Sequence, residues 1–332
     1  MLRLLALLVC TSCAYAYEGA EVITFFGYND AIELKNEHCR VILTPQVGGK
    51  IMHYSWHGVD TLMIDPSESG WRYDPKTFNQ DTFVDGGGRF DYGNSRILTD
   101  RNIHKLGRWE GVITGPRSAL LSSQIHPDNG LQFTRKFELD KNTARLTITQ
   151  TMTNKSKKKA TAFFWGRTFH KGGGIVITPL TPPTFFPKSY TVKTGDQLFF
   201  EPPPDKAISK SDDYLIISNQ PKAKKIGIET FHGWYAYLMK ENIMVLREFE
   251  VFPDRPYIDI VGGIFSVYYD KNYRGFDVVE LEPNGPRETL EYGQSASFKE
   301  VWHLLTYTFP KNRDKVDLER FEKVVSGVIS IN

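Results

Sequence analysis

The chain has 332 residues, of which 40% are hydrophobic and 24% are charged, as in a folded protein with a large core. Its 41 lysines and arginines are nearly balanced by 39 aspartates and glutamates. The resulting net charge of +2 is too small for a protein that binds nucleic-acid phosphates, so we expect no nucleic-acid partner.

The N-terminus has the pattern of a secretory signal peptide. Arg3 precedes an apolar run that is too short to span a bilayer, and the small-x-small sequence Ala14-Tyr15-Ala16 follows. We therefore expect residues 1–16 to be removed and a single domain of residues 17–332 to be secreted without a membrane anchor. Of three cysteines only Cys39 would remain, which excludes an intramolecular disulfide. The sequon at Asn154, in a polar turn, predicts N-glycosylation.

Most of the chain is predicted to form β-strands. Short segments rich in β-branched and aromatic residues, bounded by Gly, Pro, Asn and Asp, recur along it. The clearest are residues 39–45, 50–56, 131–139, 144–152, 226–231, 234–240, 243–252, 256–269, 277–283 and 300–309. One helix is predicted after Asp317, where Leu318, Phe321, Val325 and Val328 recur at helical spacing. The pattern indicates an all-β sandwich or barrel with few helices.

Four segments carry candidate site residues. In residues 85–96, a glycine triplet that lets a ligand approach the backbone precedes groups that bind hydroxyls or carboxylates, namely Arg89, Asp91 and Arg96. Residues 103–111 bring His104 close to Trp109. A strand at 163–170 presents Trp165, Arg167 and Phe169 on one face, and Thr168 and His170 on the other.

The fourth segment is the strand at 278–283, where Glu280 and Glu282 share one face. A solvated strand face would also explain these carboxylates. The histidine and cysteine spacings do not match a metal site, and we expect neither a metal nor another cofactor.

Taken in order, these segments resemble the galactose mutarotase (aldose 1-epimerase) superfamily. The similar features are Gly88-Arg89-Phe90 followed by Asn94-Ser95-Arg96, a loose His104-to-Trp109 match, and Leu281-Glu282-Pro283 near the C-terminus. The resemblance implies a large single-domain β-supersandwich that binds a sugar or glycan. The family's Asn-His-x-Tyr-Phe-Asn motif is absent: Arg167 and Thr168 stand where Asn-His is expected, and His170 follows two residues later.

The resemblance also implies roles for individual residues. Glu282 would take the proton from the anomeric hydroxyl and His170 would protonate the ring oxygen. Arg89 and His104 would hold sugar hydroxyls. The other expected contacts to substrate are Asp91, Arg96, Trp109, Arg167 and Glu280.

Three functional hypotheses remain open at this point. The chain is an aldose 1-epimerase-like enzyme, or a non-catalytic extracellular protein of the same fold that binds glycans or forms part of a matrix, or a polysaccharide lyase-like enzyme. The shifted His170 favours the second hypothesis over the first.

Overall fold

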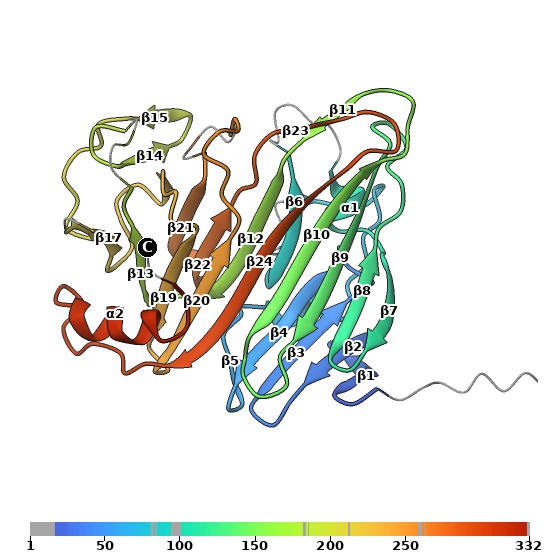
Figure 1. The fold of residues 1–332 in the computed structure, drawn as a ribbon, viewed down its shortest axis with the longest axis horizontal. Coiled ribbons are helices and arrows are strands. Elements are labelled where there is room, and N and C mark those ends of the chain that lie inside the picture. The colour runs from blue at the N-terminus through green and yellow to red at the C-terminus, as the bar shows by residue number, and fades with distance from the viewer. Residues whose placement is uncertain are drawn as a thin grey trace, which may run out of the picture.

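The protein consists of two large antiparallel β-sheets packed face to face (Figure 1). The structure is a computed structural model that describes residues 17–80, 83, 85–93, 101–181, 184, 186–211, 213–257, 261 and 263–330. The predicted signal peptide, residues 1–16, and Arg96 lie outside the described residues. The predicted all-β sandwich class is confirmed.

The first sheet has twelve strands and carries the candidate site. Its path, in spatial order, is β1 (Ala20–Phe25), β2 (Tyr28–Lys35), β3 (Cys39–Thr44), β4 (Lys50–Trp56), β6 (Gly88–Tyr92), β12 (Phe164–Lys171), β22 (Phe276–Pro283), β21 (Phe265–Tyr273), β18 (Lys225–Ile228), β14 (Tyr190–Thr194) and β15 (Gln197–Phe199), with β5 (Val59–Asp60) paired to β4.

The second sheet has ten strands and forms the other layer. Its order is β16 (Ile208–Lys210), β17 (Tyr214–Ile217), β13 (Ile175–Pro179), β19 (Trp234–Met239), β20 (Ile243–Phe249), β24 (Ser295–Thr306), β10 (Leu146–Asn154), β9 (Leu131–Leu139), β8 (Ser118–Ser122) and β7 (Glu110–Gly115). A separate pair is formed by β11 (Ala160–Ala162) and β23 (Glu288–Leu290).

The core lies between the two sheets, because each strand turns its apolar residues inward. Strands β9 and β10 show the alternation clearly, with every second residue buried. Aromatic pairs join the layers: the rings of Phe164 and Phe298 stack with centroids 5.8 Å apart, and those of Tyr235 and Phe265 at 4.4 Å. This packing explains how the fold is stabilised without a disulfide among the described residues, where Cys39 is buried and free.

Two α-helices occur among the described residues, and neither is long and apolar enough to cross a membrane. The C-terminal helix α2 (Leu318–Ser326) was predicted, and its N-cap Asp317 accepts a hydrogen bond from the N–H of Arg320. It buries Phe321 and Val325 against the outer face of the second sheet. The single-turn helix α1 (Asn102–Lys105) follows β6.

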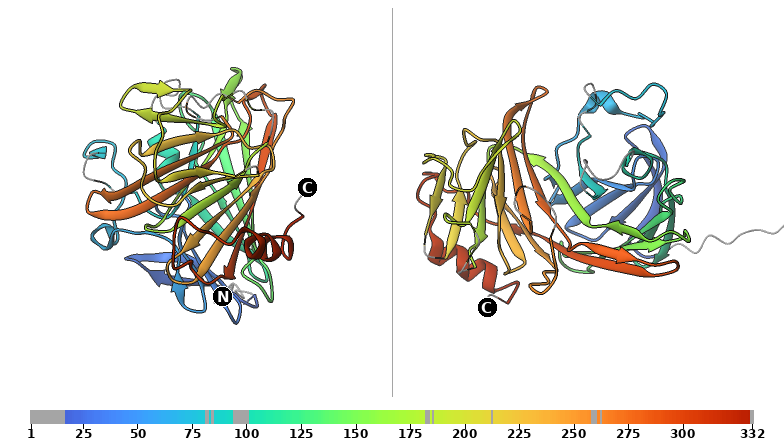
Figure 2. Two further views of the ribbon diagram at one scale, coloured as in Figure 1. Left: turned by 90° about the vertical axis from the view of Figure 1, so that its left-hand side faces the viewer. Right: turned by 90° about the horizontal axis from the view of Figure 1, so that it is seen from above.

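The outer face of the first sheet is partly covered by the segment that contains the 3₁₀-helix η1 (Pro66–Glu68). Met63 in this segment packs on Phe169 and Val278, which point away from the second sheet. In the view from above, this light-blue segment stands off the first sheet, away from β24 and β10 (Figure 2). Its path brings Asp85 back to the start of β6.

Candidate functional site

Strand register collects the candidate residues on the outer face of the first sheet. Residues that pair across an antiparallel sheet share a face. The register pairs Arg89 with Arg167, and it pairs Asp91 with Trp165. On the other side of β12, Phe169 pairs with Glu280, and Glu282 pairs with Ser266 of β21. The predicted faces of residues 163–170 are therefore confirmed.

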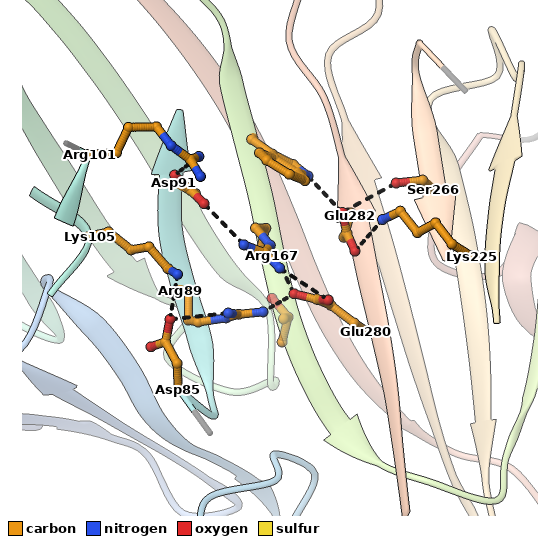
Figure 3. A network of polar contacts seen from close by, with 12 residues as sticks. Asp85, Arg89, Asp91, Arg101, Lys105, Arg167, Lys225, Ser266, Glu280 and Glu282 are labelled. Atoms are coloured by element: carbon orange, nitrogen blue, oxygen red, sulfur yellow. Dashed lines mark hydrogen bonds and ion pairs between the residues drawn. The ribbon is translucent and has the colours of Figure 1, made fainter. Parts of the chain in front are cut away.

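Charged side chains on this face form a chain of ion pairs, which the Lys225–Glu282 pair adjoins at Trp165 (Figure 3). We call ten of them the site network: Lys50, Asp85, Arg89, Asp91, Arg101, Lys105, Arg167, Lys225, Glu280 and Glu282.

At its centre, the Glu280 carboxylate accepts from two arginines. Arg89 forms an ion pair with it, and Nε of Arg167 donates to Glu280 Oε1 at 3.0 Å. Arg167 also donates to Asp91 Oδ2 at 3.2 Å, and Arg101 donates to the other oxygen of Asp91. Alternating charges thus cross from β22 through β12 to β6, which fixes the position of each side chain.

At one end of the network, Asp85 is surrounded by cations. Lys50 pairs with it, Lys105 Nζ lies 3.0 Å from Oδ2, and Arg89 donates at 3.1 Å. Burial alone would raise the pKa of Asp85, but the three cations outweigh it and hold that pKa well below its ordinary value. Burial lowers the pKa of Lys105 to about 8, despite the neighbouring carboxylates.

At the other end, Glu282 is buried and ionised. It pairs with Lys225, accepts from Nε1 of Trp165 at 2.7 Å, and accepts from the Ser266 hydroxyl at 3.3 Å. Burial would raise its pKa, but Lys225 and Arg167 outweigh burial and lower it. Glu282 is thus a hydrogen-bond acceptor, and its low pKa makes it a weak base.

The partly exposed ring of Trp165 lies among three cations of the network. Arg167 lies 4.6 Å from the ring centroid, Arg101 5.5 Å and Lys225 6.0 Å. These three cations are also the most exposed members of the network, with 13–18% of each side chain accessible. The network therefore reaches solvent around Trp165.

Asn284 adds an unpaired amide to the same face. It pairs with Trp165 across an isolated bridge, two residues beyond Glu282. Its side chain is fully buried, and neither polar atom has a hydrogen-bond partner among the residues described. A buried amide without partners leaves one acceptor and two donors for a ligand.

His170 lies on the opposite face of β12, in the core between the sheets. Its Nδ1 lies 3.0 Å from the carbonyl oxygen of Thr61, and Arg247 donates to its Nε2 at 2.9 Å. Burial and Arg247 hold the pKa of His170 well below its ordinary value. This placement corrects the expected convergence of His170 with Glu282, because neighbouring residues of a strand point to opposite sides.

His104 and Trp109 also lie outside the site network. His104 is buried, its Nε2 is 2.9 Å from the carbonyl oxygen of Gln124, and burial lowers its pKa to about 4. Trp109 donates to the carbonyl oxygen of His104 at 2.7 Å. Trp109 packs on Phe90 and His104 packs on Phe133, in the inter-sheet core. The structure therefore does not bring these two residues together with Glu282 and Arg167.

The glycine triplet serves chain packing. A Cβ on Gly86 would lie 2.4 Å from the carbonyl oxygen of Met63, and one on Gly88 2.8 Å from the ring of Trp302. Gly87 has a φ of +84°. Residues 86–88 are glycines because protein atoms surround them, which corrects the interpretation that they admit a ligand.

Asn154 is the last residue of β10, directly before the expected turn, and its side chain is fully buried. Nδ2 donates to the carbonyl oxygens of Lys158 at 2.8 Å and Leu290 at 2.9 Å. Because a glycan would be attached through this nitrogen, a glycan at Asn154 would replace these two hydrogen bonds.

Sequence reasoning missed half of the site network: Lys50, Asp85, Arg101, Lys105 and Lys225. Lys225 begins an apolar strand, and Asp85 precedes the glycine triplet, but neither position predicts a long-range ion pair.

Among the described residues, no cluster of histidine, cysteine or acidic side chains has a geometry that would hold a metal ion.

Solved structures of the galactose mutarotase type share this fold. A galactose mutarotase-like protein from Lactobacillus casei matches with a TM-score of 0.57 and 7% identity, covering 83% of this chain and 100% of its own. The GalM/aldose epimerase homologue from C. elegans matches with a TM-score of 0.52 and 12% identity, covering 83% and 99%. The Slr1438 protein from Synechocystis matches with a TM-score of 0.57 and 15% identity, covering 86% and 99%.

No protein-family model matches the sequence, and no curated protein does. At identities of 7–15%, the structural likeness shows the fold. The predicted resemblance to galactose mutarotase-like proteins is confirmed at the level of the fold.

Proposed function

We propose that this protein is a secreted sugar-binding protein whose site lies around Trp165 on the outer face of the first sheet. The observation that carries the proposal is the partly exposed Trp165 ring surrounded by Glu282, Arg167 and the unpaired amide of Asn284. A flat apolar ring suits the face of a pyranose, and ionised groups and amides suit its hydroxyls.

The second part of the proposal is that the epimerase acid–base pair is degenerate. Glu282 forms an ion pair with Lys225 and accepts a hydrogen bond from Trp165, and its pKa is lowered. The described residues place no histidine against it, and His170 lies across the sheet. A site without an acid near the ring oxygen binds a sugar but does not open its ring.

Binding is tested by calorimetric titration of residues 17–332 with a panel of neutral and charged sugars. We expect at least one sugar to bind, and Trp165→Ala to weaken that binding at least tenfold. Trp56→Ala is the matched control, because Trp56 is also partly exposed but belongs to the far end of β4, where it donates to Thr306. A panel without any binder would overturn the proposal.

Catalysis is tested by polarimetry of freshly dissolved aldohexoses. We expect equilibration no faster than in buffer. An acceleration that Glu282→Gln abolishes would restore the epimerase hypothesis.

Secretion has its own test: expression of the full chain in a secreting host is expected to release a protein that begins at Tyr17.

A further inference from the structure

The site network contains more positive than negative side chains. Its six cations are Lys50, Arg89, Arg101, Lys105, Arg167 and Lys225, and its four anions are Asp85, Asp91, Glu280 and Glu282. Glu68 also approaches, accepting from the backbone N–H of Asp85 at 3.4 Å, and counting it still leaves six cations against five anions.

Three of the six cations are deeply buried. The exposed fraction of the side chain is 2% for Lys50, 3% for Arg89 and 6% for Lys105. Burying a charge without a counter-charge is strongly unfavourable, so proteins rarely keep such a surplus without a partner for it. The Nε–H of Arg89 also has no acceptor among the described residues.

The more exposed cations are placed where a ligand would lie. Arg101, Arg167 and Lys225 surround the ring of Trp165, on which the proposed sugar stacks. An anionic group on that sugar would be within the field of all three cations, in a partly desolvated site where charge-assisted hydrogen bonds are strong.

From the charge surplus and its position, we infer that the ligand is an anionic sugar, one that carries a carboxylate, sulfate or phosphate group held by Arg101, Arg167 and Lys225. The inference rests on the proposed function and narrows it to a substrate class. It also accounts for the extra cations, which a neutral hexose leaves unexplained.

The test compares each charged sugar with its neutral parent, from which it differs by one anionic group. Glucose is titrated beside glucuronic acid, glucose 6-sulfate and glucose 6-phosphate, and galactose beside galacturonic acid. We expect at least one charged sugar to bind at least tenfold more tightly than its neutral parent, and the difference to shrink as salt is raised. The charged sugar that binds most tightly identifies the anionic group.

Arg101→Gln keeps a hydrogen-bond donor beside Asp91 and removes one charge. We expect it to reduce the ratio of charged-sugar affinity to neutral-sugar affinity about tenfold. Arg108→Gln is the matched control, since Arg108 is 62% exposed, pairs with Asp30 and lies outside the network. It makes the same change in net charge and is expected to leave the preference intact.

The outcomes separate the two proposals. Equal or tighter binding of the neutral parents would overturn the anionic inference and support the sugar site. Binding of inorganic sulfate or phosphate as tight as that of the matching sugar would overturn the inference that the ligand is a sugar. No binding by any compound would overturn the proposed function itself.

Discussion

Arg247 donates a hydrogen bond to Nε2 of His170 at 2.9 Å, deep in the core between the two sheets. A second donor of Arg247 reaches the hydroxyl of Thr168 at 2.9 Å, and its guanidinium lies 3.4 Å from the ring centroid of Trp302. His170 therefore keeps a neutral ring whose Nε2 accepts from Arg247. Its position indicates a structural role, on the other side of the sheet from Trp165.

His170→Ala tests this role. We expect the free energy of unfolding to fall by about 2–4 kcal/mol, because the variant leaves a cavity and an unpaired guanidinium. Sugar affinity is expected to stay within about twofold, since a change behind the sheet leaves the ligand contacts in place. Urea unfolding and calorimetric titration measure the two quantities. A large loss of affinity with unchanged stability would instead support a role for His170 in the site.

The buried His104 predicts that the protein loses stability in mild acid. Its pKa is about 4 in the folded chain and about 6.5 when unfolded, so between these values only the unfolded chain binds the proton. Stability therefore falls as the pH drops from about 6.5 to 4, by about 3 kcal/mol from this group. Unfolding experiments from pH 7 to 4 should show a shallower slope for His104→Gln. The exposed His232→Gln is the control and is expected to keep the slope of the parent protein.

The buried Lys105 predicts that stability also rises with pH in the alkaline range. Its pKa is lowered to about 8 by burial, so between about 8 and 10.5 the folded chain releases a proton that the unfolded chain retains. Stability from this group therefore rises with pH across that window. Lys105→Met should remove the rise and stabilise the protein at pH 7 by about 1–3 kcal/mol, as measured by urea unfolding. A loss of stability at pH 7 would show that the pair with Asp85 outweighs the burial of the charge.

From the buried amide of Asn154 we predict that the folded protein carries no glycan at this residue. Its amide nitrogen is already bonded to two carbonyl oxygens in the core, so intact-mass measurement of protein from a secreting host should show no glycan at this residue. Asn154→Asp should lower the free energy of unfolding by about 2–4 kcal/mol, because a carboxylate would face those same carbonyls. A glycan at Asn154 on folded protein would contradict both the burial and the bonds.

The sequence predicted the fold class well because periodicity is a local signal. Alternation in Leu146–Asn154 and the helical spacing of Leu318, Phe321 and Val325 report directly on burial. The site was predicted in part, with Arg89, Asp91, Arg167, Glu280 and Glu282 brought together. The partners of these residues come from elsewhere in the chain: Lys225 reaches Glu282 across β21, and Lys50 reaches Asp85 from β4. Only strand register and the loop path decide such pairs, and neither can be read from spacing.

The same limit explains the histidines. His104 and His170 both have imidazole side chains that can act as an acid or a base. Residue type alone, however, does not say whether a side chain lies on the outer face of a sheet or in the core. For His170 the alternation along residues 163–170 contained the answer, since it separates this histidine from Trp165 and Arg167. The resemblance placed His170 in one site with Glu282. The two-residue period of the strand instead placed His170 on the opposite face of the sheet, which is where it lies.

Strand β12 thus belongs to two ionic systems at once, with Arg167 in one and Thr168 and His170 in the other. The side chains of the two systems lie on opposite faces of the sheet, with the backbone of β12 between them. Substitutions at positions 165 and 167 can therefore change the outer face of the first sheet without disturbing the layer that stabilises the protein.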